Sequence, residues 1–282
     1  MKIALGLHGI VGGIGGKYGK GDYKKALELG YDHYKKYILD HNDCDVFCHT
    51  ASLERANEIL DLYQPVRHKF IPQPRFLVPS RGHTGYDEKR IQAHYHKWFS
   101  HKHVSQLRLL HERETGVKYD MMYIGRYDLA WNTVVNFSKF DPNKFWLGHW
   151  NRLDGISGPD WYKKRLKENL PLIKDNKYNN DDIKLVGYPH NDEGVIDQWA
   201  FSSPKNMDMY CKLYDKMDEY LIRNPNTWWD GKSTIHDHTG GISNHRLLPC
   251  HLENMGLLDK VDFAYYLHDD FPTVRRMYFG NK

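Results

Sequence analysis

Two residues of opposite charge, Arg126 and Asp128, follow a short apolar run, residues 119–124, that predicts a buried strand. A carboxylate at the end of such a strand can bind a divalent cation, and an arginine beside it can bind phosphate oxygens directly. Either arrangement would stabilise the negative charge that a diphosphate gains as it leaves. The alternative is a structural ion pair that binds nothing, and the spacing alone does not separate the two.

A further carboxylate, Asp197, precedes a second predicted strand, residues 199–202. As a general base it would deprotonate an acceptor hydroxyl during a displacement, and Asp192 and Glu193 are nearby substitutes. A helix N-cap, or a buried hydrogen-bonded carboxylate, would explain the same residue without catalysis. Both interpretations of Asp197 stay open at this point.

Residues 2–7 predict the first strand, and the segment that follows it is rich in glycine. The backbone of that segment can therefore approach a ligand closely. It contains neither a GxGxxG fingerprint that leads into a helix nor a GxxxxGK[ST] phosphate loop. Its position suits contact with a nucleoside at the end of the first strand. The predicted contacts are His8, Gly9, Gly12 and Gly13.

The chain has 18 histidines, and the tripeptide HDH places His236 and His238 on the same side of an extended segment. This spacing can chelate a metal. Together with Asp128, these two residues are the predicted ligands of Mn²⁺ or Mg²⁺. His251 and His268 are further candidates, although most histidines in proteins bind no metal.

Strands and helices alternate along the chain, which is typical of a mostly parallel sheet with ligands at the carboxyl ends of its strands. Apolar runs predict strands at residues 2–7, 45–50, 66–71, 119–124, 145–147, 184–187, 199–202 and 261–267. Apolar residues spaced three to four apart predict helices over residues 23–39, after the N-cap Ser52, from Pro204 to about Arg223, and over 243–255. The same spacing predicts one broken helix or two consecutive helices over 88–114.

Composition narrows the class of protein. The 40 basic residues are nearly balanced by 36 acidic ones, so nucleic acid is not an expected partner. No run approaches the roughly 20 apolar residues of a membrane span, and the first residues lack a convincing signal-peptide cleavage site. The four cysteines form no CxxC pairs. We therefore expect a soluble, cytoplasmic protein with reduced thiols.

The order of five segments resembles a family of small GT-A-type glycosyltransferases of bacteria and viruses, over roughly residues 1–260. These segments are KIALGLHG, DVFCHT, YQPVRHKFI, YDMMYIGRYDL and VIDQWAFSSPKNMDMYCKLYD. In that family an R-x-D triplet replaces the D-x-D metal motif, and Arg126-Tyr127-Asp128 matches it. The resemblance implies that Asp128 contacts the metal, ribose or diphosphate, and that Asp197 lies near the reacting sugar. A strict D-x-D is absent, which leaves metal dependence open.

This resemblance implies a single GT-A-like, Rossmann-like α/β domain, with a nucleotide-sugar half at 1–131 and an acceptor half at 132–282. Arg108 and Arg126, from the segment 105–131, complete the predicted nucleotide-binding residues. The donor would be a UDP- or GDP-sugar and the acceptor a glycan or glycoconjugate. The activity would be hexosyl or pentosyl transfer.

Three other classes remain open. The glycine-rich loop is compatible with a nucleotide-binding oxidoreductase, although no acidic residue stands at the expected second-strand end. The histidines and aspartates would suit a metal-dependent hydrolase. Aromatic residues make up 14% of the chain, and Trp228 and Trp229 could stack on a sugar in a non-catalytic carbohydrate-binding protein or lie buried in the core.

Overall fold

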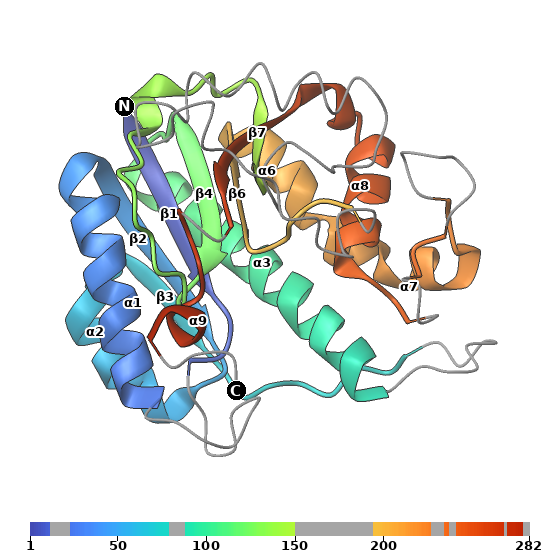
Figure 1. Ribbon diagram of the computed structural model, residues 1–282, viewed down its shortest axis with the longest axis horizontal. Helices are drawn as coiled ribbons and strands as arrows, with labels where there is room; N and C mark the ends of the chain where they lie inside the picture. The colour runs from blue at the N-terminus through green and yellow to red at the C-terminus, as the bar shows by residue number, and fades with distance from the viewer. Residues whose placement is uncertain are drawn as a thin grey trace.

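The computed structural model describes residues 1–11, 23–78, 88–149, 194–226, 234–236, 241–267 and 270–278 of the chain. These residues form one seven-stranded sheet with helices on both faces (Figure 1). The strand order is β3-β2-β1-β4-β6-β5-β7, so both halves of the chain contribute to the same sheet. The predicted α/β fold with a mostly parallel sheet is confirmed. The predicted strand at 184–187 lies outside the described residues.

The strands are β1 (Lys2–His8), β2 (Asp43–Thr50), β3 (Arg67–Phe70), β4 (Met121–Arg126), β5 (Phe145–His149), β6 (Trp199–Ser202) and β7 (Val261–Tyr266). Strands β3, β2, β1 and β4 run parallel, and β5 is parallel to β7. Strand β6 runs antiparallel to both of its neighbours, β4 and β5. Since β2 and β3 are added on one side of β1 and β4 on the other, the direction of strand addition reverses between β1 and β4.

The helices are α1 (Tyr23–Tyr37), α2 (Ala56–Tyr63), α3 (Glu88–Thr115), α6 (Pro204–Cys211), α7 (Leu213–Arg223), α8 (Asn244–Asn254) and α9 (Val274–Tyr278). Pro204 begins α6 as predicted, but a tight turn at Lys212 separates α6 from α7. Among these helices, none is both long and apolar enough to cross a membrane.

The prediction of a broken helix at 88–114 is wrong, because α3 is one continuous helix of 28 residues. It contains no glycine or proline to interrupt it. Its apolar periodicity fails because polar residues such as His101, Ser105 and Arg108 take buried positions along its length. Hydrogen bonds satisfy some of the polar atoms of these buried side chains, so the helix continues where the apolar pattern stops.

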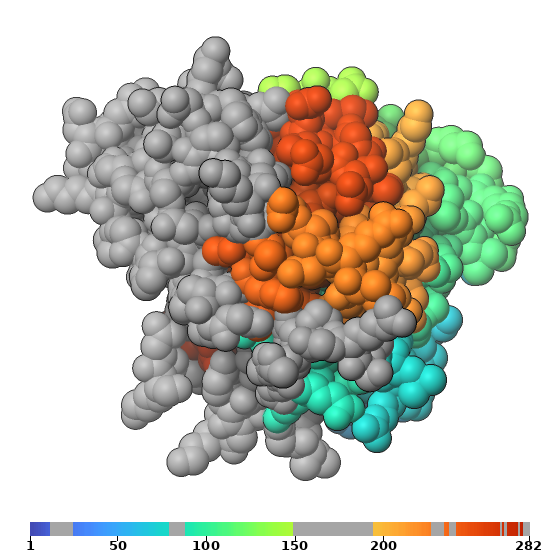
Figure 2. All heavy atoms as spheres, turned by 90° about the vertical axis from the view of Figure 1, so that its right-hand side faces the viewer, coloured from blue at the N-terminus to red at the C-terminus, as the bar shows by residue number. Residues whose placement is uncertain are grey.

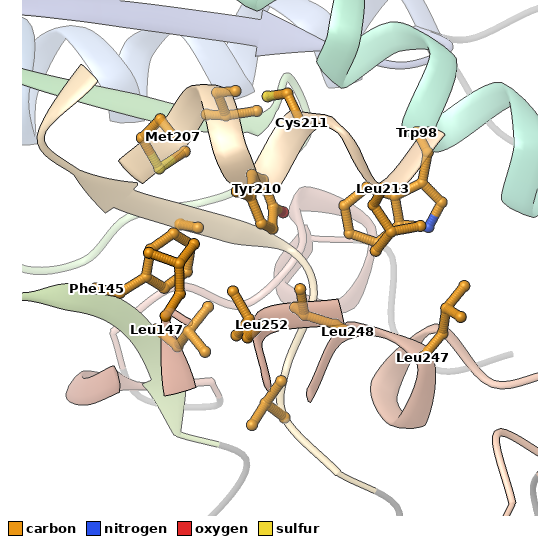
Figure 3. Close-up of a cluster of buried hydrophobic side chains, with 14 of the residues drawn as sticks. Trp98, Phe145, Leu147, Met207, Tyr210, Cys211, Leu213, Leu247, Leu248 and Leu252 are labelled. Carbon is orange, nitrogen blue, oxygen red and sulfur yellow. The ribbon is translucent and has the colours of Figure 1, made fainter. Parts of the chain in front are cut away.

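Each face of the sheet has its own core. On one face, β1 residues such as Ile3 and Leu5 pack with α1 and α2. On the other face, α3, α6 and α8 enclose a second apolar cluster in which Trp98 and Tyr210 face Leu248 (Figure 3). Helices α7 and α8 contribute side chains to this cluster and form part of the described outer surface on this side of the molecule (Figure 2).

Two glycines let the long helices approach the strands that carry the site. A Cβ added at Gly6 would lie 2.3 Å from Val104 Cγ1 of α3. A Cβ added at Gly30 of α1 would lie 2.3 Å from the carbonyl oxygen of Tyr127, directly before Asp128. Both distances are far shorter than a van der Waals contact, so glycine at these two positions lets α1 and α3 pack as closely as they do.

Candidate functional site

Three basic residues stand side by side at the carboxyl ends of the central parallel strands. In the sheet register, His8 of β1 pairs with His49 of β2 on one side and with Arg126 of β4 on the other. Figure 1 shows this edge of the sheet at the opposite end from the N-terminus. In open α/β sheets, ligands bind outside the carboxyl ends of the strands where the strand order reverses, which here lies between β1 and β4.

His8 forms a buried imidazole pair with His101 of α3, with 2.8 Å between their Nε2 atoms. Burial, followed by repulsion from Lys97, holds the pKa of His8 well below its usual range. Burial does the same for the pKa of His101. Both imidazoles are therefore neutral at pH 7. The Nδ1 atoms of both rings are buried and have no hydrogen-bond partner among the described residues.

His49 lies in a similar setting. Its ring stacks on His103 of α3, with 5.1 Å between the ring centres, and contacts Phe99 edge-on. Burial lowers the pKa of His49 to about 3. Neither of its ring nitrogens has a hydrogen-bond partner in the described part of the chain. Unsatisfied buried polar atoms cost about 1–3 kcal/mol each, so their gathering at one edge indicates a place where water or a ligand supplies the partner.

Arg126 and Asp128 form a bidentate ion pair, with Nε and Nη2 of the arginine 2.7 and 2.6 Å from the two carboxylate oxygens. The Asp128 carboxylate raises the pKa of Arg126 above its usual value. The side chains are 41% and 30% exposed, so solvent and ligands reach them. A guanidinium has five N–H donors, of which Asp128 takes two, and the others can face a ligand anion.

The backbone around this pair is fixed from two sides. The hydroxyl of Tyr34 on α1 donates to the carbonyl oxygen of Arg126 at 2.7 Å. The carbonyl oxygen of Asp128 accepts from Val274 N of α9 at 2.8 Å. A further bridge joins Leu129 to Thr273. Sequence reasoning missed this support, because a five-residue helix leaves almost no periodic signal.

Asp197 lies close to the same edge, two residues before the start of β6. Its Oδ2 accepts a hydrogen bond from Lys97 of α3, and its Oδ1 lies 3.5 Å from Nδ1 of His245. Burial alone would raise the pKa of the Asp197 carboxyl, but the attraction of Lys97, His245 and Arg126 outweighs burial and holds the pKa well below its usual range. Burial lowers the pKa of Lys97. The Asp197 carboxylate therefore has little affinity for a further proton.

The loop after β1 is tied to the loop after β2. Thr50 donates its hydroxyl to the carbonyl oxygen of Gly9 at 2.8 Å, and Val11 N donates to the Ser52 hydroxyl at 2.8 Å. Gly9 has a φ of 108°, which a residue with a side chain rarely adopts. Ser52 is the N-cap residue of the 3₁₀ turn Leu53–Arg55, which precedes α2, but its side chain makes no capping hydrogen bond; the hydroxyl holds the neighbouring loop instead. Gly12 and Gly13 lie outside the described residues.

Arg108, predicted to bind the nucleotide, lies 11 residues beyond Lys97 on α3, which is about 16 Å along the helix towards the amino ends of the parallel strands. The structure does not bring it together with Arg126. Its guanidinium is 2% exposed and binds Asp208 and Glu112. An open groove lies beside it, lined also by Lys118. Because the buried charge there is already neutralised, we place the candidate site at the carboxyl end.

The predicted metal ligands do not gather around Asp128 in the described part of the chain. His236 forms a backbone bridge with Ile242, and His238 lies outside the described residues, as do Asp192, Glu193, His268, Trp228 and Trp229. His251 is buried in α8, where its ring nitrogens contact Tyr220 and Met209. The described residues contain no group of three or more histidine, cysteine or acidic side chains that could hold a metal ion.

The functional candidates that sequence reasoning missed are Lys97, His101 and His245. His94, Lys97 and His101 recur at intervals of three and four, which places them on one face of α3. That polar stripe on a predicted helix was a usable signal. His245 carried none, because its neighbours in space are about 50 residues away along the chain.

No model of a known protein family matches the chain, and the search of curated proteins finds no match to it.

Proposed function

We propose that this protein is a glycosyltransferase with a GT-A-like fold that transfers a sugar from a UDP- or GDP-sugar to a glycan or glycoconjugate acceptor. The observation that carries the proposal is the row of His49, His8 and Arg126 at the carboxyl ends of three parallel strands. This row lies where the strand order reverses, the place at which nucleotides bind to open α/β sheets. The sequence resemblance supports the same activity.

Arg126 would bind the donor diphosphate. Asp128 holds the guanidinium in one orientation, and the remaining N–H groups can bind phosphate oxygens. As the bond between the sugar and the diphosphate breaks, negative charge grows on the leaving oxygen, and a fixed cation stabilises it. This function needs an accessible arginine, and Arg126 is 41% exposed.

The buried imidazoles would bind hydroxyl groups. A neutral imidazole carries one donor and one acceptor nitrogen, which matches a hydroxyl group, itself both donor and acceptor. His8 and His49 are neutral and keep buried nitrogens without partners among the described residues. Ribose and sugar hydroxyls therefore suit them better than a phosphate would, since phosphate favours charged or donor-only groups.

The described residues do not form a dedicated site for Mn²⁺ or Mg²⁺. Both oxygens of Asp128 accept from Arg126, whose positive charge opposes a nearby cation. Metal dependence remains a prediction of the resemblance, and adding Mn²⁺ to the binding assay tests it.

A thermal-shift panel of UDP, GDP, CMP, dTDP and NAD, each with and without Mn²⁺, tests the function. A ligand that binds only the folded state raises the Tm. We expect one nucleoside diphosphate to raise the Tm. We also expect Arg126→Met to reduce the affinity for that nucleoside diphosphate at least tenfold. Arg223→Met is the matched control, because Arg223 also pairs with a carboxylate, Glu219, but lies on the exposed end of α7.

No shift with any nucleoside diphosphate, or a shift with NAD alone, would contradict the proposal. An unchanged affinity in Arg126→Met would move the binding site elsewhere. Transfer is then measured directly, by release of the identified nucleoside diphosphate from its sugar in the presence of candidate acceptor glycans.

A further inference from the structure

The row of basic side chains at the carboxyl ends of the strands continues beyond His49. In the sheet register, His49 of β2 pairs with Lys69 of β3, the strand at one edge of the sheet (Figure 1). The row across the four parallel strands is therefore Lys69, His49, His8 and Arg126. Neighbouring strands lie about 4.8 Å apart, so the backbone of Lys69 is about 14 Å from that of Arg126. The two cations stand at opposite ends of the row.

Contacts with α3 fix the position of the Lys69 ammonium group. Lys69 Nζ lies 3.3 Å from Nδ1 of His103, and the His103 ring stacks on the ring of His49. Burial, followed by repulsion from Lys69, lowers the pKa of His103 to about 4, so this ring is neutral at pH 7. Nδ1 of a neutral ring can accept a hydrogen bond, and the ammonium group donates to it. Lys69 and His49 therefore face the same helix.

The charge of Lys69 is not neutralised within the described part of the chain, where no carboxylate forms an ion pair with it. Arg126, at the other end of the row, is paired with Asp128. An ammonium group has three N–H donors, of which the contact with His103 uses one. The Lys69 residue is half-buried, so solvent and ligands reach it. Its remaining donors can therefore bind an acceptor atom of a ligand.

The place of Lys69 in the row determines which part of a nucleotide it would meet. In the proposed function, the diphosphate binds Arg126, and the ribose hydroxyls bind His8 and His49. Lys69 lies one strand further along the same row. In a nucleotide, the base is attached on the far side of the ribose from the phosphates. A nucleotide bound along the row would therefore have its base at Lys69.

The exocyclic groups of the bases differ in what they offer to an ammonium group. Guanine O6 and the O4 atom of uracil, which thymine shares, accept hydrogen bonds, whereas cytosine N4 and adenine N6 belong to amino groups that donate. A lysine ammonium group only donates, so it can bind the carbonyl oxygens but not the amino groups. A ligand that cannot accept the hydrogen bond offered by a site is rejected. Lys69 is thus suited to distinguish the two kinds of base.

We propose that Lys69 selects the base of the donor nucleotide by donating a hydrogen bond to the exocyclic carbonyl oxygen of uracil or guanine. This inference rests on the proposed glycosyltransferase function and deepens it, because it names the feature that the donor base must have. His103 is the positioning residue, since its Nδ1 holds the ammonium group at the end of the row. Donors with cytosine or adenine are excluded by their amino groups.

Four nucleoside diphosphates test the inference as two matched pairs. UDP and CDP carry a carbonyl and an amino group at the same position of a pyrimidine, and GDP and ADP do so for a purine. Isothermal titration calorimetry with the wild-type protein gives the affinity for each. In the pair that binds, we expect the carbonyl nucleotide to bind about tenfold more tightly, because a hydrogen bond to a charged group changes an equilibrium by at least about that factor.

The variant Lys69→Met removes the donors and the charge but keeps an unbranched side chain. We expect the affinity for the carbonyl nucleotide to fall about tenfold and the preference over its amino partner to fall below about threefold. Lys69→Arg keeps N–H donors at this position and should retain the preference. Lys118→Met is the control: Lys118 is exposed, and its loss removes the same charge at the amino end of β4. It should leave affinity and preference unchanged.

The preference between the two nucleotides of a pair separates a specific contact from a general attraction of anions. An equal loss of affinity for both nucleotides in Lys69→Met would mean that the lysine acts through its charge alone, and would overturn the inference. A preference that survives in Lys69→Met would do the same. A wild-type protein that binds both nucleotides of a pair equally, or prefers the amino one, would also overturn it and leave the proposed function standing. A wild-type protein that binds no nucleoside diphosphate would overturn the proposed function and this inference with it.

Discussion

The two ends of the parallel strands both carry charged side chains, but the fold uses them differently. At the amino end, the buried Arg108 binds Asp208 through two 2.7 Å contacts and Glu112 at 2.6 Å. At the carboxyl end, Arg126 binds a single carboxylate and stays 41% exposed. Buried imidazole nitrogens beside it have no partner among the described residues. The first arrangement stabilises the fold, whereas the second is suited to a ligand.

A second network at the amino end supports this distinction. Lys2 Nζ lies 3.0 Å from Asp43 and 2.9 Å from Asp45, and the Tyr119 hydroxyl donates to Asp45 at 2.6 Å. The Tyr119 and Lys2 hydrogen bonds help to lower the pKa of Asp45 even though burial opposes this. These groups compensate one another within the fold, so a ligand would have to displace existing bonds to bind there.

Arg108→Met should have the largest effect on stability. Removing the guanidinium leaves Asp208 and Glu112 without their buried partner, and breaking a buried ion pair costs about 3–5 kcal/mol. Because Asp208 is 30% exposed and can be hydrated, we expect the lower end of that range. Urea unfolding monitored by circular dichroism gives the free energy. Nucleotide affinity of the folded variant should match wild type, and a loss above threefold would place Arg108 in the binding site.

His49→Phe should reduce the acid sensitivity of the fold. The pKa of His49 is about 3 in the folded state, against about 6.5 in an unfolded chain. Between these values the unfolded chain binds a proton that the folded state excludes, so falling pH destabilises the protein. One such histidine contributes about 1.4 kcal/mol per pH unit over most of this interval.

The test compares urea unfolding of wild type and His49→Phe at pH 8, 6 and 5. At pH 8 the ring is neutral in both states, so the difference measured there is the packing effect of the substitution and serves as the reference. As the pH falls from 8, the stability of the variant should increase relative to that of wild type, beyond the difference measured at pH 8. Parallel pH dependences would show that His49 takes up a proton in the folded state, for example through water entering from the site.

Gly30→Ala should separate the turn at Asp128 from α1. The added methyl group would lie 2.3 Å from the Tyr127 carbonyl oxygen, so the helix or the turn must shift. Overpacking of this kind costs about 1–3 kcal/mol, of which the better helix propensity of alanine returns up to about 1. Glu28→Ala, on the exposed side of α1, is the control for propensity alone. A variant as stable as this control would mean that the turn moves freely.

The sequence was most informative where one local rule decided the structure. The apolar run at 199–202 predicted β6 to the residue, and Pro204 marked the start of α6. The antiparallel direction of β6 was not predictable, because an apolar run has the same appearance in either direction. The direction of a strand depends on its pairing with strands that are distant in the sequence, which no local pattern encodes.

In the candidate site, too, the residues with a local sequence signal were predicted and those joined only by long-range contacts were not. Arg126 and Asp128 were identified because they stand at the end of a predicted strand, where Arg126 is the last residue of β4. The Lys97–Asp197 ion pair joins residues 100 positions apart, and nothing in either local sequence indicates the other. The prediction for Arg108 was wrong for a related reason, because the sequence does not show which end of a helix lies near a ligand. Only the fold shows which end of α3 faces the ligand edge.

The smallest expected effect is the contribution of the Arg126–Asp128 pair to stability. Both side chains are partly exposed, and exposed ion pairs contribute about 0.2–1 kcal/mol. A double-mutant cycle of Arg126→Met and Asp128→Asn, read by urea unfolding without ligand, should give a coupling energy in that range. A coupling above about 2 kcal/mol would make this pair a structural one like Arg108 and Asp208. The contrast between the two ends would then rest on the unpartnered imidazoles alone.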